Sequence, residues 1–217
     1  MWRRLHGKFI VFEGGEGTGK STQARLLADA LGDAGLCVVI TREPGGAPGA
    51  ELLRRLLVES PPTPGWAPLS EALLHYAARN EHLHKTIRPS LARGAWVVSD
   101  RFADSTAAYQ GAGLALNGEI FTCLSRLVIG DDAPDLTLVL DLATEEALAR
   151  AASRGAQRDR YESMGFEFHR RIRSAFLDIA RAGGRRYAII DAAPDIRRVQ
   201  QDVRDVVRER LGIVLSG

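Results

Sequence analysis

Two kinds of hydrophobic pattern alternate along the chain. Short continuous apolar runs are typical of strands buried on both faces of a parallel sheet, whereas apolar residues recurring every three or four positions are typical of helices that bury one face. Runs of the first kind lie at 9–12, 36–40, 95–99, 136–141 and 187–191. Segments of the second kind lie at 22–31, 50–59, 70–93, 105–109, 118–129, 144–154, 166–182 and 195–211.

This alternation predicts an α/β fold, with a five-stranded parallel sheet and helices on both of its faces. The length of 217 residues suits one domain, so we assign 1–217 to a single domain. The cluster at 60–65 contains three prolines and predicts a surface loop. Pro89 lies inside the segment at 70–93, where it predicts a kink or a break because proline lacks the N–H that the helix uses.

The stretch between the first strand and the first helix carries the clearest chemical signal. The run from Gly14 to Ser21 fits the pattern G-x-x-x-x-G-K-[ST], in which glycines let backbone N–H groups surround a phosphate. In such a loop Lys20 contacts the β- and γ-phosphates, and the Ser21 hydroxyl binds Mg²⁺. The chain has only three lysines, and arginine supplies the rest of its cationic side chains. A lysine where a compact charge is required favours a phosphate-binding loop (P-loop) over a glycine-rich turn.

Composition narrows the class of protein. The net charge of +2 is too small for a bulk attraction to nucleic acid. No apolar run approaches the length of a membrane-spanning helix, and the first apolar run is too short for a signal peptide. The two cysteines, Cys37 and Cys123, stand among apolar residues and are expected to be buried thiols rather than a disulfide or a metal pair. A cytoplasmic enzyme without nucleic-acid or membrane partners is the simplest interpretation.

Polar residues follow the second and third strands. The run at 41–46 reads Thr-Arg-Glu-Pro-Gly-Gly, and Asp100 and Arg101 follow the third strand. Ligands bind at the carboxyl ends of strands in open α/β sheets. Asp100 could therefore hold Mg²⁺ or orient a phosphate acceptor, and Arg101 could clamp an anionic group. Taken alone, these two residues could equally form a surface ion pair.

A P-loop by itself leaves several classes open. The chain has no Asn-Lys-x-Asp motif for reading guanine, which disfavours a GTPase. Its length disfavours an ATP-driven motor with additional domains.

Further motifs specify the class more closely. They are the run at 41–46, Tyr76-Ala77-Ala78-Arg79, Asp100-Arg101-Phe102 with Ser-Thr-Ala-Ala-Tyr-Gln-Gly at 105–111, and Asp159-Arg160-Tyr161-Glu162. With residues 14–22 they resemble, in order and spacing and over nearly the whole chain, the thymidylate kinases. The resemblance implies a nucleoside-monophosphate-kinase-like P-loop fold. It also implies phosphorylation of dTMP to dTDP with ATP and Mg²⁺, and a homodimer formed through helices.

The resemblance implies a phosphate side to the site. Lys20 and Arg101 would stabilise the transferring phosphoryl group, and Arg101 would also contact the dTMP phosphate. Ser21 and Asp100 would lie at Mg²⁺, and Glu43 would help to order the phosphate and metal site. The residues that would bind ATP form the P-loop: Gly14, Gly15, Glu16, Gly17, Thr18, Gly19, Lys20, Ser21 and Thr22.

The resemblance also implies a nucleoside side. Arg79 and Thr106 would face the thymine edge, and Gln110 would help to close the monophosphate pocket. Tyr109 would crowd the sugar 2′ position and so favour deoxyribose, while Glu16 would reach the sugar. His75 replaces the phenylalanine that stacks on the base in the family, and we expect its flat ring to stack there instead.

A flap at about 150–162 would supply one more cation. The P-loop contains no arginine, as in the bacterial members of the family, whose flap arginine reaches the ATP phosphates. The candidates are Arg150, Arg154, Arg158 and Arg160. We place Arg154 first because it directly precedes a glycine, and Arg158 second. The flap is one residue longer than the family pattern leads us to expect, which leaves the choice open.

Two alternatives to a thymidylate kinase remain at this stage. One is another deoxynucleotide or deoxynucleoside kinase of the same fold, which a panel of acceptors would distinguish. The other is a nucleotide-dependent switch, which would turn over ATP without an acceptor and would not respond to dTMP.

Overall fold

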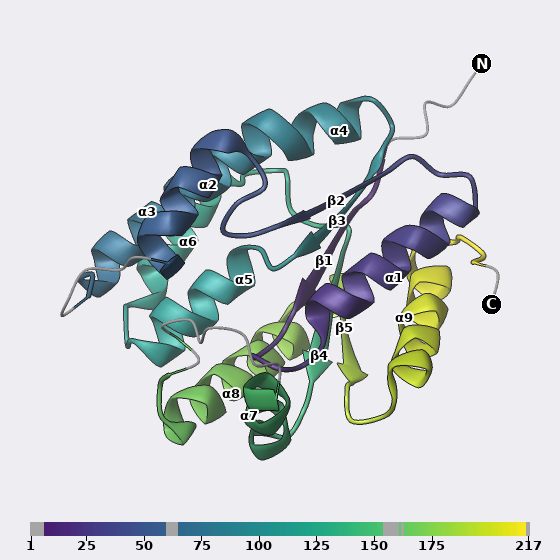
Figure 1. Ribbon diagram of the computed structural model, residues 1–217. Coiled ribbons are helices and arrows are strands. Elements are labelled where there is room, and N and C mark those ends of the chain that lie inside the picture. The colour runs from purple at the N-terminus through teal and green to yellow at the C-terminus, as the bar shows by residue number, and fades with distance from the viewer. Residues whose placement is uncertain (1–6, 60–64, 154–160, 162, 216–217) are drawn as a thin grey trace.

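The computed structural model describes the chain except for residues 1–6, 60–64, 154–160, 162 and 216–217. Five strands form one sheet in the order β2-β3-β1-β4-β5, and every neighbouring pair is parallel (Figure 1). This confirms the α/β fold and the five-stranded parallel sheet. The strands are β1 Phe9–Glu13, β2 Val38–Arg42, β3 Trp96–Asp100, β4 Leu136–Asp141 and β5 Tyr187–Asp191.

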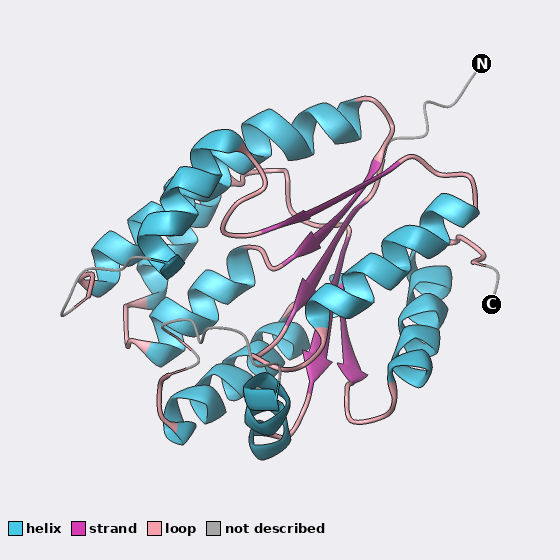
Figure 2. Ribbon diagram, viewed as in Figure 1, coloured by secondary structure: helices cyan, strands magenta, loops and turns pink. Residues whose placement is uncertain are grey.

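Helices occupy most of the rest of the described chain (Figure 2). The α-helices are α1 Lys20–Asp33, α2 Pro48–Arg54, α3 Pro68–His82, α4 Arg88–Ala92, α5 Ala103–Thr106, α6 Gly118–Val128, α7 Thr144–Ser153, α8 Phe166–Ala182 and α9 Ile196–Leu211. Three π-helical segments continue α-helices: η1 Arg55–Glu59, η2 Leu83–Ile87 and η3 Ala107–Gly113. A 3₁₀ turn, η4 Gly184–Arg186, precedes β5.

Three π-helical segments interrupt predicted helices; the interruption beside Pro89 agrees with the predicted kink or break, and the other two were not predicted. The segment predicted at 70–93 is divided into α3, η2 and α4, and the wider η2 turn comes just before Pro89. A π turn relocates hydrogen bonds, so it accommodates the N–H that proline lacks. The segment at 50–59 changes from α2 to η1, and the helix predicted at 105–109 begins at Ala103 and runs on to Gly113.

The strands alternate their side chains between two helical layers. Ile10 and Phe12 of β1 pack on one face with residues of α1 and α9. Phe9 and Val11 pack on the opposite face with residues of α3, η2 and α6. Val139 of β4 packs on that second face too, against α8 and η3. Helices therefore cover both faces of the sheet, as predicted.

The strand register brings three chain segments to one edge of the sheet. Phe12 of β1 and Arg42 of β2 both align with Asp100 of β3. The residues that follow these positions, Glu13, Glu43 and Arg101, therefore meet where the three strands end. The sheet thus gathers the P-loop, the 41–46 run and the Asp100-Arg101 pair into one place.

The expectation that both cysteines are buried was wrong. Cys37, in the turn before β2, and Cys123, on α6, are exposed free thiols. Apolar neighbours in the sequence do not fix which face of a helix or turn a side chain occupies, and Cys123 lies on the outer face of α6. Among the residues that the structure describes, no helix has both the length and the apolar character needed to cross a membrane.

Candidate active site

The P-loop connects β1 to α1, and its course requires glycine. Gly14, Gly17 and Gly19 have positive φ angles of 136°, 75° and 89°. A Cβ atom on Gly17 would lie 1.9 Å from the carbonyl oxygen of Ala147 in α7. The backbone conformation therefore favours glycine at all three positions, and the close approach to α7 also excludes a side chain at Gly17.

Lys20 is the first residue of α1, and its side chain is buried. Its Nζ donates a hydrogen bond of 2.6 Å to the carbonyl of Gly15, which holds the ammonium over the loop. Burial, followed by the nearby Arg101 guanidinium, lowers the pKa of Lys20 to about 8. An ammonium beside the N–H groups of a helix N-terminus is an arrangement that binds phosphate.

Ser21 and Asp100 supply oxygen atoms next to the P-loop. The Ser21 hydroxyl donates a hydrogen bond to Asp100 Oδ2. The second oxygen, Asp100 Oδ1, is buried without a hydrogen-bond partner in the described structure. The described residues contain no group of three or more His, Cys, Asp or Glu side chains suited to a metal ion. Because Mg²⁺ is usually bound by one or two carboxylates together with substrate phosphates, these two residues fit an ion carried by a nucleotide.

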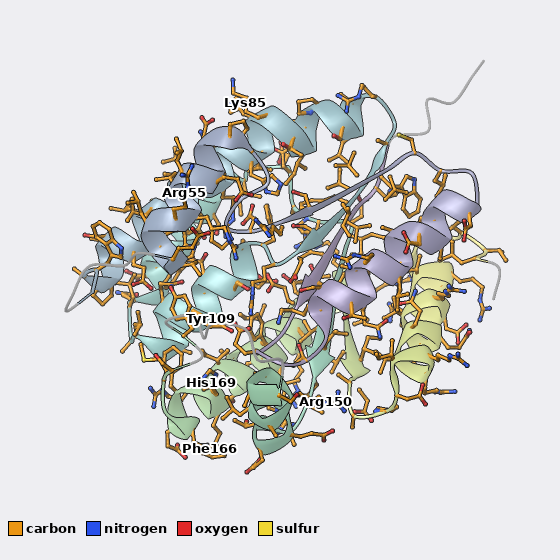
Figure 3. The ribbon with its side chains drawn as sticks, in the orientation of Figure 1. Arg55, Lys85, Tyr109, Arg150, Phe166 and His169 are labelled. Carbon is orange, nitrogen blue, oxygen red and sulfur yellow. The ribbon has the colours of Figure 1, made fainter. Side chains whose placement is uncertain are left out.

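Arg101 makes several side-chain hydrogen bonds beside the P-loop, in the region expected to bind phosphate. Its φ of 73° is unusual for a residue other than glycine. Its guanidinium donates to Glu16 Oε1 (2.5 Å), the Tyr109 hydroxyl (3.2 Å), the Gly14 carbonyl (3.1 Å) and Ser105 Oγ (3.1 Å). The Tyr109 hydroxyl donates in turn to Glu16 Oε1, at 2.8 Å. The structure therefore brings Glu16, Arg101 and Tyr109 together (Tyr109 is labelled in Figure 3).

Glu13 holds the segment that follows Arg101, and it was not among the predicted site residues. It ends β1, is fully buried, and accepts hydrogen bonds from Phe102 N (2.8 Å), Ser105 N (3.1 Å) and Ser105 Oγ (2.6 Å). Burial, together with the nearby Asp104 carboxylate, raises the pKa of Glu13 to about 7. An acidic residue that ends an apolar strand is the sequence signal that could have identified it.

A second group of contacts is centred on Arg79 and Glu43. The Arg79 guanidinium donates to Glu43 Oε2 (2.9 Å) and to Thr106 Oγ1 (3.0 Å). The other Glu43 oxygen lies 2.9 Å from His82 Nδ1, and His82 Nε2 lies 2.7 Å from Thr41 Oγ1. Arg79 Nη1 is buried and has no hydrogen-bond partner among the described residues. His82, fully buried, is a second residue that the sequence analysis missed.

A third group of contacts surrounds Gln110. Its Nε2 donates to Glu71 Oε1 (2.8 Å) and to the Tyr161 hydroxyl (2.9 Å). The Tyr161 hydroxyl donates to the same Glu71 oxygen at 2.5 Å and lies 3.4 Å from His75 Nε2. Gln110 Oε1 is buried, with no hydrogen-bond partner in the part of the chain that the structure covers. Glu71 and Tyr161 were not predicted as site residues.

One cavity of about 520 Å³ reaches all three groups. Lys20, Arg101, Arg79 and Gln110 all line it. It also has an apolar part, which the sequence analysis missed, at the end of β5 and the start of α9. The residues there are Ala192, Pro194, Ile196 and Val199. The cavity therefore joins the P-loop to the groups around Arg79 and Gln110 and to this apolar part.

Comparison with known proteins decides the family. Residues 12–203 match the sequence model of thymidylate kinase. The chain belongs to the thymidylate kinase family. It is 52% identical to the thymidylate kinase of Caulobacter vibrioides over 95% of this chain and 99% of that protein. It is 47% identical to the thymidylate kinase of a Bradyrhizobium species over 94% of this chain and 91% of that protein.

A solved structure agrees. The thymidylate kinase of Ehrlichia chaffeensis superposes with a TM-score of 0.76 at 35% identity, covering 93% of this chain and 98% of that one. The resemblance found in the sequence and the P-loop kinase fold are thereby confirmed. The chain is a phosphotransferase of the thymidylate kinase family.

The structure describes the predicted flap, at about 150–162, only in part. Arg154, Arg158 and Arg160 lie outside the described residues. Arg150 belongs to α7 and is labelled in Figure 3. It lines the cavity. Its guanidinium donates to the carbonyls of Ala192 (2.8 Å) and Ala193 (2.9 Å), so it is tied to the segment between β5 and α9.

Proposed function

We propose that this chain transfers the γ-phosphoryl group of ATP to dTMP, with Mg²⁺, and releases dTDP. One observation carries the proposal. The cavity that contains the P-loop is also lined by Arg79 and Gln110, whose Nη1 donor and Oε1 acceptor have no partner among the described residues. Buried polar atoms without partners are rare, and at a binding site they favour a ligand that satisfies them.

Thymine has the complementary groups. Its N3–H is a donor and its C4 carbonyl is an acceptor, so Arg79 Nη1 would donate to O4. Gln110 Oε1 would accept from N3, which is a role at the base instead of the expected one at the monophosphate pocket. Cytosine has an acceptor at N3 and an amino donor at C4, which would leave both protein atoms facing like groups. A site built to hydrogen-bond one ligand rejects an analogue that leaves its buried groups unpaired.

The phosphate side requires positioning and charge rather than covalent chemistry. The attacking phosphate of dTMP is already anionic, so no general base is needed. Lys20 and Arg101 would neutralise charge on the transferring group, and Arg101 would hold the acceptor phosphate. Ser21 and Asp100 would hold Mg²⁺, which when bound neutralises charge on the β- and γ-phosphates.

Further roles stay proposals. Tyr109 would exclude a 2′-hydroxyl, Glu16 would reach the sugar, and His75 would stack on the base. Both aromatic residues line the cavity, which supports these assignments. Arg154, with Arg158 second, remains our candidate for the flap arginine. We also retain a cytoplasmic location, because both proposed substrates are intracellular nucleotides.

A coupled assay for ADP formation tests the function. We expect rapid turnover with dTMP, slower turnover with dUMP, and little with dCMP or thymidine, which lacks the acceptor phosphate. Faster turnover with dCMP or thymidine would identify a different kinase. ATP hydrolysis that no acceptor stimulates would favour a nucleotide-dependent switch.

We also propose a homodimer. Leu52, Leu56, Leu69 and Leu73 are exposed on α2, η1 and α3, and Leu127 of α6 is 79% exposed. These helices pack against one another on the same side of the sheet (Figure 1), so their exposed leucines provide an apolar surface that a second copy would cover.

Light scattering tests the dimer. It should give a dimer mass for the wild type and a monomer mass for Leu73→Glu combined with Leu127→Glu. Val214→Glu, which changes an exposed apolar residue near the C-terminus, is the control and should remain dimeric. A wild-type monomer at micromolar concentration would refute the dimer without affecting the proposed reaction.

A further inference from the structure

The orientation of the Gln110 carboxamide is set by two hydrogen-bond acceptors. The Gln110 amide nitrogen donates to Glu71 Oε1 at 2.8 Å, and the same oxygen receives the Tyr161 hydroxyl proton, so it acts as an acceptor in both contacts. Glu71 is fully buried on α3, and Gln110 is 1% exposed on η3. Water therefore does not compete for this contact.

The Tyr161 hydroxyl imposes the same orientation through a second contact, which also depends on Glu71. Its single proton is donated to Glu71 Oε1, at 2.5 Å. Toward Gln110, 2.9 Å away, the hydroxyl oxygen can then only accept. Both N–H bonds of the Gln110 amide are thus used by Glu71 and Tyr161, and Oε1 lies at the opposite edge of the planar carboxamide.

We propose that Glu71 and Tyr161 are positioning residues that fix the Gln110 carboxamide and thereby select pyrimidines with an N–H at position 3. This inference rests on the proposed function, since it concerns the base of the dTMP acceptor. Neither residue needs to touch the substrate for the effect. They act by preventing the 180° flip of the amide that would offer N–H groups to the acceptor N3 of cytosine.

A flipped Gln110 would be costly in the wild type. Its Oε1 would then face the Glu71 carboxylate and the Tyr161 oxygen, giving acceptor against acceptor in a buried site. In Glu71→Gln, the new side chain can rotate to present its own N–H₂ group. The flip then costs little, and Gln110 can adapt to either base. Tyr161→Phe removes one of the two acceptors and leaves the other.

The test measures kcat/KM for dTMP, dUMP and dCMP in the wild type, Glu71→Gln and Tyr161→Phe. The dTMP/dCMP ratio should fall at least about tenfold in Glu71→Gln, which corresponds to ~1.4 kcal/mol. It should fall about threefold in Tyr161→Phe, because Glu71 still holds the amide. The dTMP/dUMP ratio should stay within about twofold in both, since uracil and thymine share N3–H and O4.

A matched control is Tyr187→Phe. Tyr187 also donates a hydrogen bond to a half-buried carboxylate, Asp104, at 2.9 Å, but it does not line the cavity. This variant should leave both ratios unchanged. If Glu71→Gln does not fold, as judged by thermal melting, Tyr161→Phe decides the question.

Two results would overturn the inference. The first is an unchanged dTMP/dCMP ratio in folded, active variants. The second is an equal fall of the dTMP/dCMP and dTMP/dUMP ratios, which would indicate general loosening of the pocket. Failure of the proposed function is distinguishable, because then the wild type itself would not use dTMP.

Discussion

The Glu16 carboxylate accepts a 2.5 Å hydrogen bond from the Arg101 guanidinium, although the two residues are 85 positions apart. Glu16 belongs to the P-loop after β1, and Arg101 follows β3, the neighbouring strand. The Tyr109 hydroxyl joins both. The proposed contacts to the acceptor phosphate and to its sugar are therefore held in one hydrogen-bonded unit.

Lys20→Met should abolish phosphoryl transfer without lowering the melting temperature. Loss of one preorganised charge at a developing anion typically costs about 10²–10³ in kcat. The Lys20 ammonium is buried, and burial of a charge opposes folding, so its removal should offset the lost bond to Gly15. Single-turnover kinetics and calorimetry would check the two parts. Near-normal turnover in the folded variant would contradict the P-loop assignment.

The pH dependence of kcat/KM for ATP should show a limb near pH 8. Burial lowers the pKa of Lys20 to about 8, so the ammonium loses its charge as the pH rises through that value. Because kcat/KM reports ionisations of the free enzyme, activity should fall above about pH 8. Lys20→Arg, although less active, should lack this limb because arginine stays protonated. An identical limb in that variant would assign it to another group.

Substitutions of Tyr109 should affect the selectivity for deoxyribose and the turnover rate separately. Tyr109→Phe keeps the ring but loses the hydroxyl that contacts Glu16 and Arg101. We expect it to retain discrimination against ribonucleotides while kcat falls about tenfold, through the loss of hydrogen bonds to charged groups. Tyr109→Ala should admit the ribonucleotide. The measurement is kcat/KM for dTMP against its ribo counterpart. Unchanged selectivity in Tyr109→Ala would place Tyr109 away from the sugar.

His82→Phe should weaken dTMP binding more than it slows turnover. His82 holds one oxygen of Glu43, and the other oxygen of Glu43 holds Arg79. Loss of a buried hydrogen bond to a charged group costs about 1.5–3 kcal/mol, so we expect a rise in KM for dTMP of about tenfold or more. Arg88→Ala, which removes a half-buried ion pair with Asp132, is the control and should leave KM unchanged. A fall confined to kcat would argue against this chain of contacts.

Glu13 should make stability fall as pH rises. Its pKa in the folded protein is about 7, above the ordinary value of 4.5, so between these pH values the folded state binds more protons than the unfolded state. The contribution of Glu13 to the free energy of unfolding is therefore greatest below about pH 4.5 and decreases up to about pH 7. Glu13→Gln should flatten this part of the stability profile in denaturant titrations. Asp104→Asn should shift it to lower pH, because the Asp104 charge helps to raise the pKa. A profile unchanged by Glu13→Gln would assign the titration elsewhere.

Local sequence patterns were enough to predict the strands and the P-loop. The runs at 136–141 and 187–191 coincide with β4 and β5, because a continuous apolar run favours a strand of a parallel sheet. The inner strand β4 is buried, whereas the edge strand β5 leaves Ile189 43% exposed. The glycines of the P-loop are required by the backbone itself. Among the helix interruptions, only η2 has a sequence signal, the proline at position 89; η1 and η3 interrupt segments whose apolar spacing continues.

The sequence by itself determined the sheet, the P-loop and the family, because each depends on residues that are close together in the chain or on motifs in a fixed order. Only the tertiary structure decided which polar side chains are buried and which groups they face. Glu71 and Tyr161 are 90 positions apart, and Glu43 and His82 are 39 apart. A buried carboxylate is acceptable only where donors surround it, and those donors come from other elements. The pairing of β1, β2 and β3 and the packing of α3 against η3 brought the donors together.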